Sequence, residues 1–334
     1  MDFPQFIQVF KSLVGESFRH AIASRLLPII IGYALLILML AATIHFHNIP
    51  SSNGMDTIER APLEEVQRLG REAAEKSGIP IIQGEIRLLF GAIRIPWGNF
   101  RENAIRYLES LLVFFSSDAI GLIFAIIWTG AFIPEFFQGF WWSMFRIRPV
   151  PLGLLLCAKV ASVFVVFLTF GVILIFGTWL VLGISTGGWN ELFLWSLFVM
   201  LLQFISFYPV SVYFGVLSRN TMVAMVATLA FWALCWFINQ ARISFFSSED
   251  SNTTFSLLAT MIDFGYWILP KPIDFSIILS DLLGSMKDSP PPVSWSMAWQ
   301  KGKIISILSI STSFLSGLVF LWFASMELKN PTKE

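Results

Sequence analysis

Charged residues and cysteines are scarce in this chain. Of its 334 residues only 13% are Asp, Glu, Lys or Arg, about half the share found in an ordinary soluble domain. The formal net charge is zero, so no overall field favours nucleic acid or another strongly charged partner. The two cysteines, Cys157 and Cys235, both lie in apolar runs, which favours free buried thiols over a structural disulfide.

Motifs of common active sites are also absent from the sequence. There is no Gly-rich phosphate loop ending in Gly-Lys-Ser/Thr, no His-Glu-x-x-His and no Gly-x-Ser-x-Gly. His45 and His47 could join a metal site, but no cysteine or acidic cluster nearby would complete the coordination. We interpret them as polar residues that end a membrane span, and we expect no catalytic, metal or cofactor site in this chain.

Long apolar runs dominate what the chain does contain. Its hydrophobic share is 56%, with 34 Phe and 13 Trp, and a membrane-spanning helix needs about 20 mostly apolar residues. We therefore predict an all-α polytopic membrane protein with six transmembrane helices. The predicted spans are residues 26–45, 111–133, 152–184, 192–217, 221–240 and 304–326.

The segment before the first span has a different pattern. In residues 1–25, apolar residues recur at helical spacing among polar ones, and no signal-peptide cleavage site is evident. This pattern predicts an N-terminal amphipathic helix that lies in the membrane interface. Basic residues in the short flanking segments predict that residues 1–25 and the tail 327–334 are both cytoplasmic, in a multi-pass protein of the cell (inner) membrane.

Two long segments, 46–110 and 241–303, are then predicted to face outward. The first carries both charge signs over residues 59–76, as a solvated helix does. It continues into residues 85–96, which are apolar enough to lie on the membrane surface or to pair with neighbouring elements. The second is polar and contains several prolines. We expect two large outer loops or small caps rather than independent domains.

Asp118 and Gln203 are the polar residues of interest inside the predicted spans. An ionisable group within a span is costly and usually faces the bundle interior or a water-filled path. Asp118 therefore marks an intramembrane polar site, or else it is an acid near the outer face that caps the helix with Ser116 and Ser117. Gln203 belongs to a polar stripe around Pro209, for which hydrogen bonding between helices is the simpler explanation.

The segment 134–151 lies between the second and third predicted spans. Pro134 is expected to end the preceding helix, and Gly139 permits a turn or a close approach. Aromatic residues such as Phe140 can lie in the interface while Arg146 and Arg148 reach lipid headgroups or a docked protein. From the residues alone, an ordinary interfacial loop is the simpler interpretation.

This segment resembles one in the membrane permease subunits of ATP-binding-cassette (ABC) transporters, of the exporter-type (type-two) family. These subunits often carry Gly-Glu-x-x-x-Gly-Thr after the second span, then a Ser-x-Pro-Val step and a span that begins near Gly-Lys. Pro134 and Phe140 depart from that pattern, whereas the interfacial helix, six spans and two outer segments resemble the family plan. The residues that stand in similar order here are Glu135, Gly139, Pro149, Val150 and Lys159.

The resemblance implies that residues 134–151 form the element that couples the permease to a separate cytoplasmic ABC ATPase. It also implies a second permease copy or a paralogue in the bilayer, ATP bound only by the partner ATPase, and export as the direction of transport. The implied coupling residues are Glu135, Gly139, Arg146, Arg148 and Pro149. The implied membrane anchors are Phe140, Trp141 and Trp142.

An ion-gradient-driven secondary transporter and a non-transporting membrane scaffold are the alternatives. The transporter alternative favours several buried charges, or discontinuous helices in repeated halves. Asp118 is the only clear charged candidate in the predicted spans, and no internal repeat is visible. A membrane enzyme is the least favoured function, for want of any grouping of nucleophile, base or metal ligands.

Overall fold

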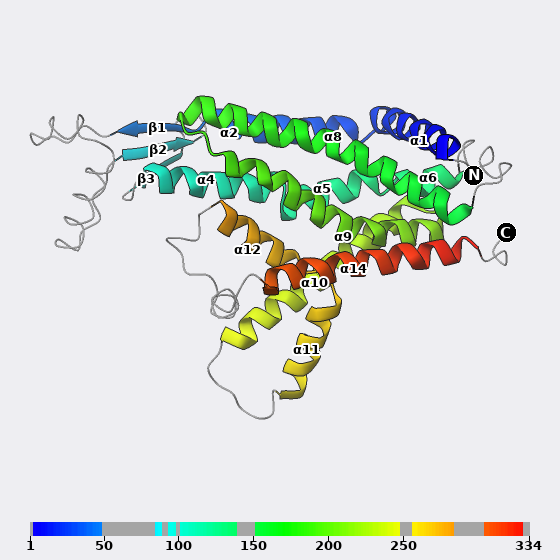
Figure 1. Ribbon diagram of the computed structural model, residues 1–334. Coiled ribbons are helices and arrows are strands. Elements are labelled where there is room, and N and C mark those ends of the chain that lie inside the picture. The colour runs from blue at the N-terminus through cyan, green and yellow to red at the C-terminus, as the bar shows by residue number, and fades with distance from the viewer. Residues whose placement is uncertain are drawn as a thin grey trace, which may run out of the picture.

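A computed structural model describes residues 3–48, 84–88, 93–97, 101–138, 151–247, 256–283 and 304–329, and in these ranges the chain is mainly helical (Figure 1). The longer helices are α1 (Phe3–Ala23), α2 (Leu27–Ala42), α4 (Arg101–Ser116), α8 (Leu152–Thr186), α9 (Trp195–Ser218), α10 (Thr221–Ser247) and α14 (Ile304–Glu327). The shorter helices are α5 (Ala119–Thr129), α6 (Phe132–Gln138), the 3₁₀ helix η3 (Glu191–Leu194), α11 (Ser256–Ile268) and α12 (Pro272–Leu282).

Helices long enough to cross a membrane make up most of this structure. Five stretches have the required length and apolar composition: Leu108–Gln138, Leu152–Thr186, Glu191–Ser218, Thr221–Ser244 and Leu308–Glu327. A sixth span results if α1 and α2 are counted together across the bend of 79° between them. Alone, α2 has 16 residues, about 24 Å of helix against a hydrocarbon core of about 30 Å. The prediction of a polytopic helical membrane protein is confirmed at this level, with five or six spans.

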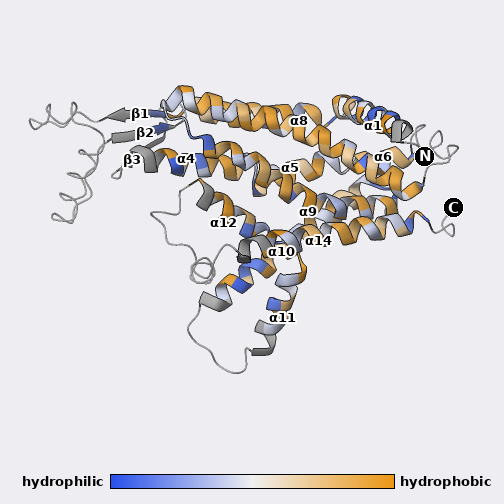
Figure 2. Ribbon diagram, viewed as in Figure 1, coloured by the Kyte–Doolittle hydropathy of each residue, from blue (hydrophilic) through white to orange (hydrophobic). Residues whose placement is uncertain are grey.

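Apolar side chains lie on the outside of the helices as well as between them. Figure 2 shows hydrophobic residues along most of α5, α8 and α9. Ile184 of α8 is 70% exposed and Phe237 of α10 is 65% exposed. A helix that is hydrophobic on all sides must be covered by protein or by lipid, so these outward side chains fit a membrane-spanning bundle. Both cysteines are free, as expected; Cys235 is buried, whereas Cys157 is exposed.

The interior of the bundle is built around α9, which packs against α5, α10, α12 and α14. Aromatic rings connect it to α8, because Phe204 stacks on Phe167 of α8 with centroids 3.9 Å apart. Within α9, Phe204 also stacks on Tyr208, with centroids 4.8 Å apart. Figure 1 places α1 and the C-terminal end of α14 at one end of the bundle and the strands at the other.

The second predicted span, 111–133, is not one continuous helix in the structure. Helical structure is interrupted at Ser117–Asp118 and again at Gly130–Ala131, and α6 then runs through Pro134 to Gln138. The expectation that Pro134 ends a helix is therefore wrong. Pro134 is the third residue of α6, and the first-turn N–H groups of a helix have no acceptor within it, so a proline is tolerated there.

A small antiparallel sheet corrects the all-α prediction. Its strands β1 (His45–Asn48), β2 (Gly84–Leu88) and β3 (Ile93–Trp97) pair in the order β1-β2-β3, with His47 opposite Glu85. The described residues of the segment 85–96, namely 85–88 and 93–96, thus pair with neighbouring strands, which is the second of the two arrangements considered for this segment. His45 and His47 lie in β1 rather than at the end of a helix. The helix predicted over residues 59–76 lies outside the described residues.

The predicted outer loop 241–303 also contains regular structure. The helix α10 continues to Ser247, and α11 and α12 follow it. The helix α12 begins with Pro272, and a proline at the first helical position is a common helix start. Buried side chains of α12, such as Phe275 and Leu279, join a core cluster with α8 and α9, so this part of the segment packs against the bundle.

Candidate functional site

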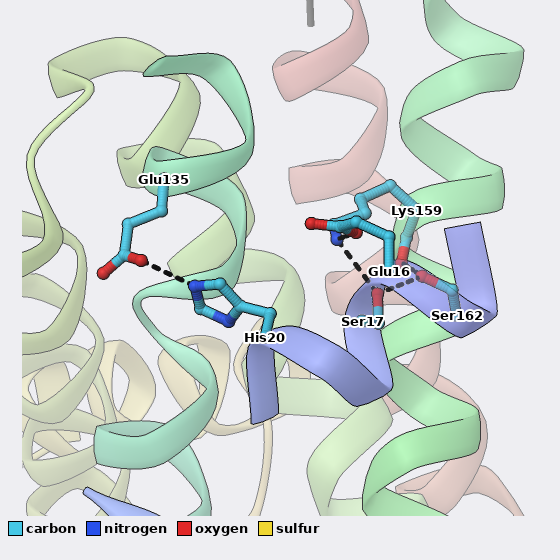
Figure 3. Close-up of polar contacts among 6 residues, drawn as sticks. All are labelled: Glu16, Ser17, His20, Glu135, Lys159 and Ser162. Atoms are coloured by element: carbon cyan, nitrogen blue, oxygen red, sulfur yellow. Dashed lines mark hydrogen bonds and ion pairs between the residues drawn. The ribbon is translucent and has the colours of Figure 1, made fainter. Parts of the chain in front are cut away.

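The first candidate site is a polar cluster that joins three helices at one end of the bundle. Figure 3 shows its six residues, which we call the α1 cluster: Glu16, Ser17 and His20 of α1, Glu135 of α6, and Lys159 and Ser162 of α8. Four buried residues of α1 recur every fourth position and form one stripe: Val9, Leu13, Ser17 and Ala21. Positions four apart share a helix face, and Ser17 is the polar member of this stripe.

Lys159 is the centre of the α1 cluster. Its side chain is fully buried, and its ammonium group donates hydrogen bonds to the Glu16 carboxylate and, at 2.9 Å, to the Ser17 hydroxyl. The Ser17 and Ser162 hydroxyls are 2.8 Å apart. A buried ammonium group is tolerated only when a counter-charge and hydrogen-bond acceptors replace its hydration. Glu16 supplies the charge, and both serines extend the network from α1 to α8.

His20 and Glu135 connect α1 to α6. The imidazole Nε2 of His20 lies 2.6 Å from a carboxylate oxygen of Glu135, and the His20 ring meets the edge of Phe132 with centroids 4.6 Å apart. The Glu135 side chain is 53% exposed. Of the predicted coupling residues, Glu135 is therefore described, and its carboxylate binds within the chain while remaining open to solvent.

The remaining predicted residues of segment 134–151 lie outside the described ranges: Gly139, Phe140, Trp141, Trp142, Arg146, Arg148 and Pro149. Within the described part, the partners of Glu135 and Lys159 on α1 were missed from the sequence. Lys159 is also an ionisable residue inside a predicted span, 152–184, so its position could have marked it as a charged candidate beside Asp118, the only one singled out. Its pairing with Glu16, 143 positions away, has no local signal.

The second candidate site is the break between α4 and α5. The backbone N–H groups of Ser117 and Asp118 both donate to the Val113 carbonyl, at 2.8 and 3.1 Å. The hydrogen bond from Asp118 therefore reaches back five residues, one more than in a regular α-helix. The Tyr33 hydroxyl of α2 donates to the Phe115 carbonyl in the same turn. Backbone hydrogen bonds that reach back five residues close the C-terminal turn of many helices.

Asp118 and Gln203, predicted separately, meet at this break. The Gln203 side-chain N–H donates to the Asp118 carboxylate at 2.8 Å, and their exposures are 4% for Asp118 and 1% for Gln203. Asp118 precedes α5 but makes no side-chain capping hydrogen bond. Ser276 of α12 lines the same cavity as Asp118, while its hydroxyl donates to the Pro272 carbonyl at 3.2 Å. The structure thus places the acid in a buried contact between three helices, in contrast to the helix-capping alternative.

A third polar cluster lies among α10, α11, α12 and α14. The Asp274 carboxylate accepts hydrogen bonds from the Tyr266 and Ser309 hydroxyls, and Lys271 donates to the Thr312 hydroxyl. The ammonium group of Lys271 lies 4.8 Å from the Tyr266 ring centroid, a cation–π distance. Burial lowers the pKa of Lys271 to about 8, although the charge of Asp274 opposes this shift.

This lowered pKa predicts a pH dependence of stability. Unfolded Lys271 titrates near its ordinary value of 10.5 and the folded residue near 8, so between these values the unfolded chain binds more protons. Stability should therefore rise from about pH 8 to about pH 10. We expect Lys271→Met to remove this rise, as measured by thermal unfolding of both proteins in detergent. Parallel profiles for the wild type and the variant would contradict the assignment.

No three His, Cys, Asp or Glu side chains gather closely enough to hold a metal ion within the ranges that the structure describes. The three sites consist instead of hydrogen bonds between helices and, in the α1 cluster, a buried ion pair between Lys159 and Glu16. No protein-family model, curated protein or solved structure matches the chain.

Proposed function

We propose that the chain is the membrane permease subunit of an ATP-driven exporter of the ABC class, coupled through residues 134–151 to a separate cytoplasmic ATPase. The observation that supports this best is the α1 cluster. The proposed coupling segment begins within α6 and ends just before α8, and the cluster holds both helices to α1 through Glu135 and Lys159. A force on the segment would therefore act on three helices together.

The buried part of the cluster suits a mechanical role. Lys159, Glu16 and Ser17 form a desolvated network, and breaking such a network costs several kcal/mol once one partner is lost. Helices α1 and α8 would consequently move as one unit when the ATPase subunits close on ATP. The exposed side of Glu135 would remain available to the ATPase, together with Arg146 and Arg148 of the same segment.

The test is recruitment of the ATPase by a variant with reversed charge. We expect Arg146→Glu/Arg148→Glu to reduce co-purification of an ATPase subunit with the tagged chain at least tenfold, because two docking cations become repulsive. Quantitative mass spectrometry of the purified membrane complex measures the ratio of the two subunits. Membrane insertion and yield should be unchanged.

A matched control reverses two basic residues outside the segment. Arg25→Glu/Lys329→Glu makes the same change in net charge on the same predicted side of the membrane, and it should leave the ATPase ratio near the wild-type value. Wild-type recruitment by the Arg146/Arg148 variant, or equal loss in both variants, would refute docking through this segment.

A further inference from the structure

Asp118 is a buried carboxylate without a cationic partner among the residues that the structure describes. The ion pairs among the described residues are Lys159–Glu16, His20–Glu135 and Arg242–Asp263, and none involves Asp118. Gln203 contributes a hydrogen bond but no charge, and the neighbouring Ser276 is also uncharged. An isolated buried carboxylate is expensive in free energy, and more so within a membrane span. A positively charged group that binds there would offset this cost.

A cavity of about 260 Å³ lies beside this carboxylate. Its polar lining comes from Asp118 and three hydroxyl side chains, Ser110, Ser276 and Ser280. The remainder is apolar: Leu111, Val113, Phe114, Leu279 and Leu283. The cavity therefore has a negative, hydroxyl-bearing part and a hydrophobic part, the pattern of small-molecule sites in proteins.

The size and the walls of the cavity distinguish between classes of cation. A water molecule in the liquid takes about 30 Å³, so the cavity could hold several waters or one small organic molecule. A bare metal ion needs a close cage of oxygen ligands, which the leucines, Val113 and Phe114 cannot supply. An organic cation uses both parts, with its charge at the carboxylate and its hydrocarbon against the apolar wall.

We propose that this cavity binds a small aliphatic amine in its ammonium form. The ammonium group would donate one hydrogen bond to the Asp118 carboxylate and others to nearby acceptors, since it has three N–H donors. One such acceptor is the side-chain oxygen of Gln203, which is buried and has no partner among the described residues. The hydrocarbon chain would lie against Phe114, Leu279 and Leu283. This binding site goes beyond the proposed function, because it does not depend on how transport is energised.

Binding of n-hexylamine to the purified full-length chain tests the site. We expect n-hexylamine to raise the thermal unfolding temperature in a saturable manner, and 1-hexanol at the same concentration to have little effect. The affinity should increase about fourfold for each added methylene group from n-butylamine to n-hexylamine, as burial of apolar surface implies. Asp118→Asn should weaken n-hexylamine binding at least tenfold, whereas Asp118→Glu should retain most of it.

Glu109→Gln is the matched control, because Glu109 of α4 is another buried carboxyl group, which accepts a hydrogen bond from Asn190 and does not line the cavity. It should bind n-hexylamine like the wild type. If Asp118→Asn does not fold, Ser280→Leu keeps the carboxylate but fills the cavity and should also abolish binding. Equal effects of 1-hexanol and n-hexylamine, unchanged binding by both cavity variants, or an equal response to NaCl alone would overturn the proposal.

Discussion

Lys159→Met should destabilise the protein by about 3–5 kcal/mol, the usual cost of removing one partner from a buried ion pair. The Lys159 side chain is 1% exposed and that of Glu16 is 11% exposed, so the remaining carboxylate would have little access to water. The substitution also removes the hydrogen bond to Ser17 and the cation–π contact with Phe136, whose ring centroid is 5.0 Å away. Unfolding followed by circular dichroism in detergent micelles measures the loss.

Two further variants separate the charge effect from packing. Adding Glu16→Gln to Lys159→Met removes the orphaned charge, and we expect the double variant to recover most of the lost stability. Lys329→Met makes the same chemical change at an exposed position near the end of α14 and should stay within about 0.5 kcal/mol of the wild type. If Lys159→Met costs no more than Lys329→Met, the ion pair does not hold α1 against α8.

The apolar runs predicted the long helices well because lipid-facing helices need no amphipathic pattern, only length and composition. The predicted span 152–184 corresponds to α8, which ends at Thr186, and the predicted span 304–326 corresponds to α14, which ends at Glu327. The boundary predicted after residue 25 corresponds to the bend between α1 and α2. These features are encoded locally, so the sequence alone was sufficient.

Features that depend on contacts between distant residues were missed. The break before Pro134 falls at Gly130–Ala131. An added Cβ atom on Gly130 would lie 2.5 Å from Met225 Cγ of α10, so α10 packs closely against the chain at this break. The sheet needs β1 and β2 to meet across 35 residues that have no described structure, although Glu85 and Arg87 alternate with apolar neighbours. Likewise, Asp118 and Gln203 each stand out in the sequence as polar residues inside predicted spans. Their contact, however, arises from the packing of α9 against the break between α4 and α5.

The geometry of the break between α4 and α5 should depend on Gly121. A Cβ atom at this position would lie 2.1 Å from the Ser116 carbonyl oxygen and 2.6 Å from the Ser116 carbonyl carbon. Both are backbone atoms, so Gly121→Ala can be accommodated only if the turn that precedes Asp118 moves. We expect this variant to lose about 3 kcal/mol of stability, at the upper end of the usual cost of overpacking.

Two other glycines provide graded controls for the same substitution. At Gly171 the added Cβ would lie 2.3 Å from Met200 Cε, the end of a flexible side chain, so Gly171→Ala should cost less than Gly121→Ala. At Gly32, in α2, no atom lies within 4 Å of the added Cβ, so Gly32→Ala should stabilise the protein by about 0.5–1 kcal/mol. Unfolding free energies of the three variants in the same detergent test this order.

A functional consequence distinguishes displacement of the turn from a general loss of stability. Movement of Ser116 and Asp118 would draw the carboxylate away from Gln203, so Gly121→Ala should weaken n-hexylamine binding at temperatures where the variant is still folded. In Gly171→Ala the added Cβ meets the flexible side-chain end of Met200, so this variant should bind the amine like the wild type. If Gly121→Ala binds it normally and is as stable as Gly32→Ala, the close approach of Gly121 to Ser116 does not determine the geometry of the break.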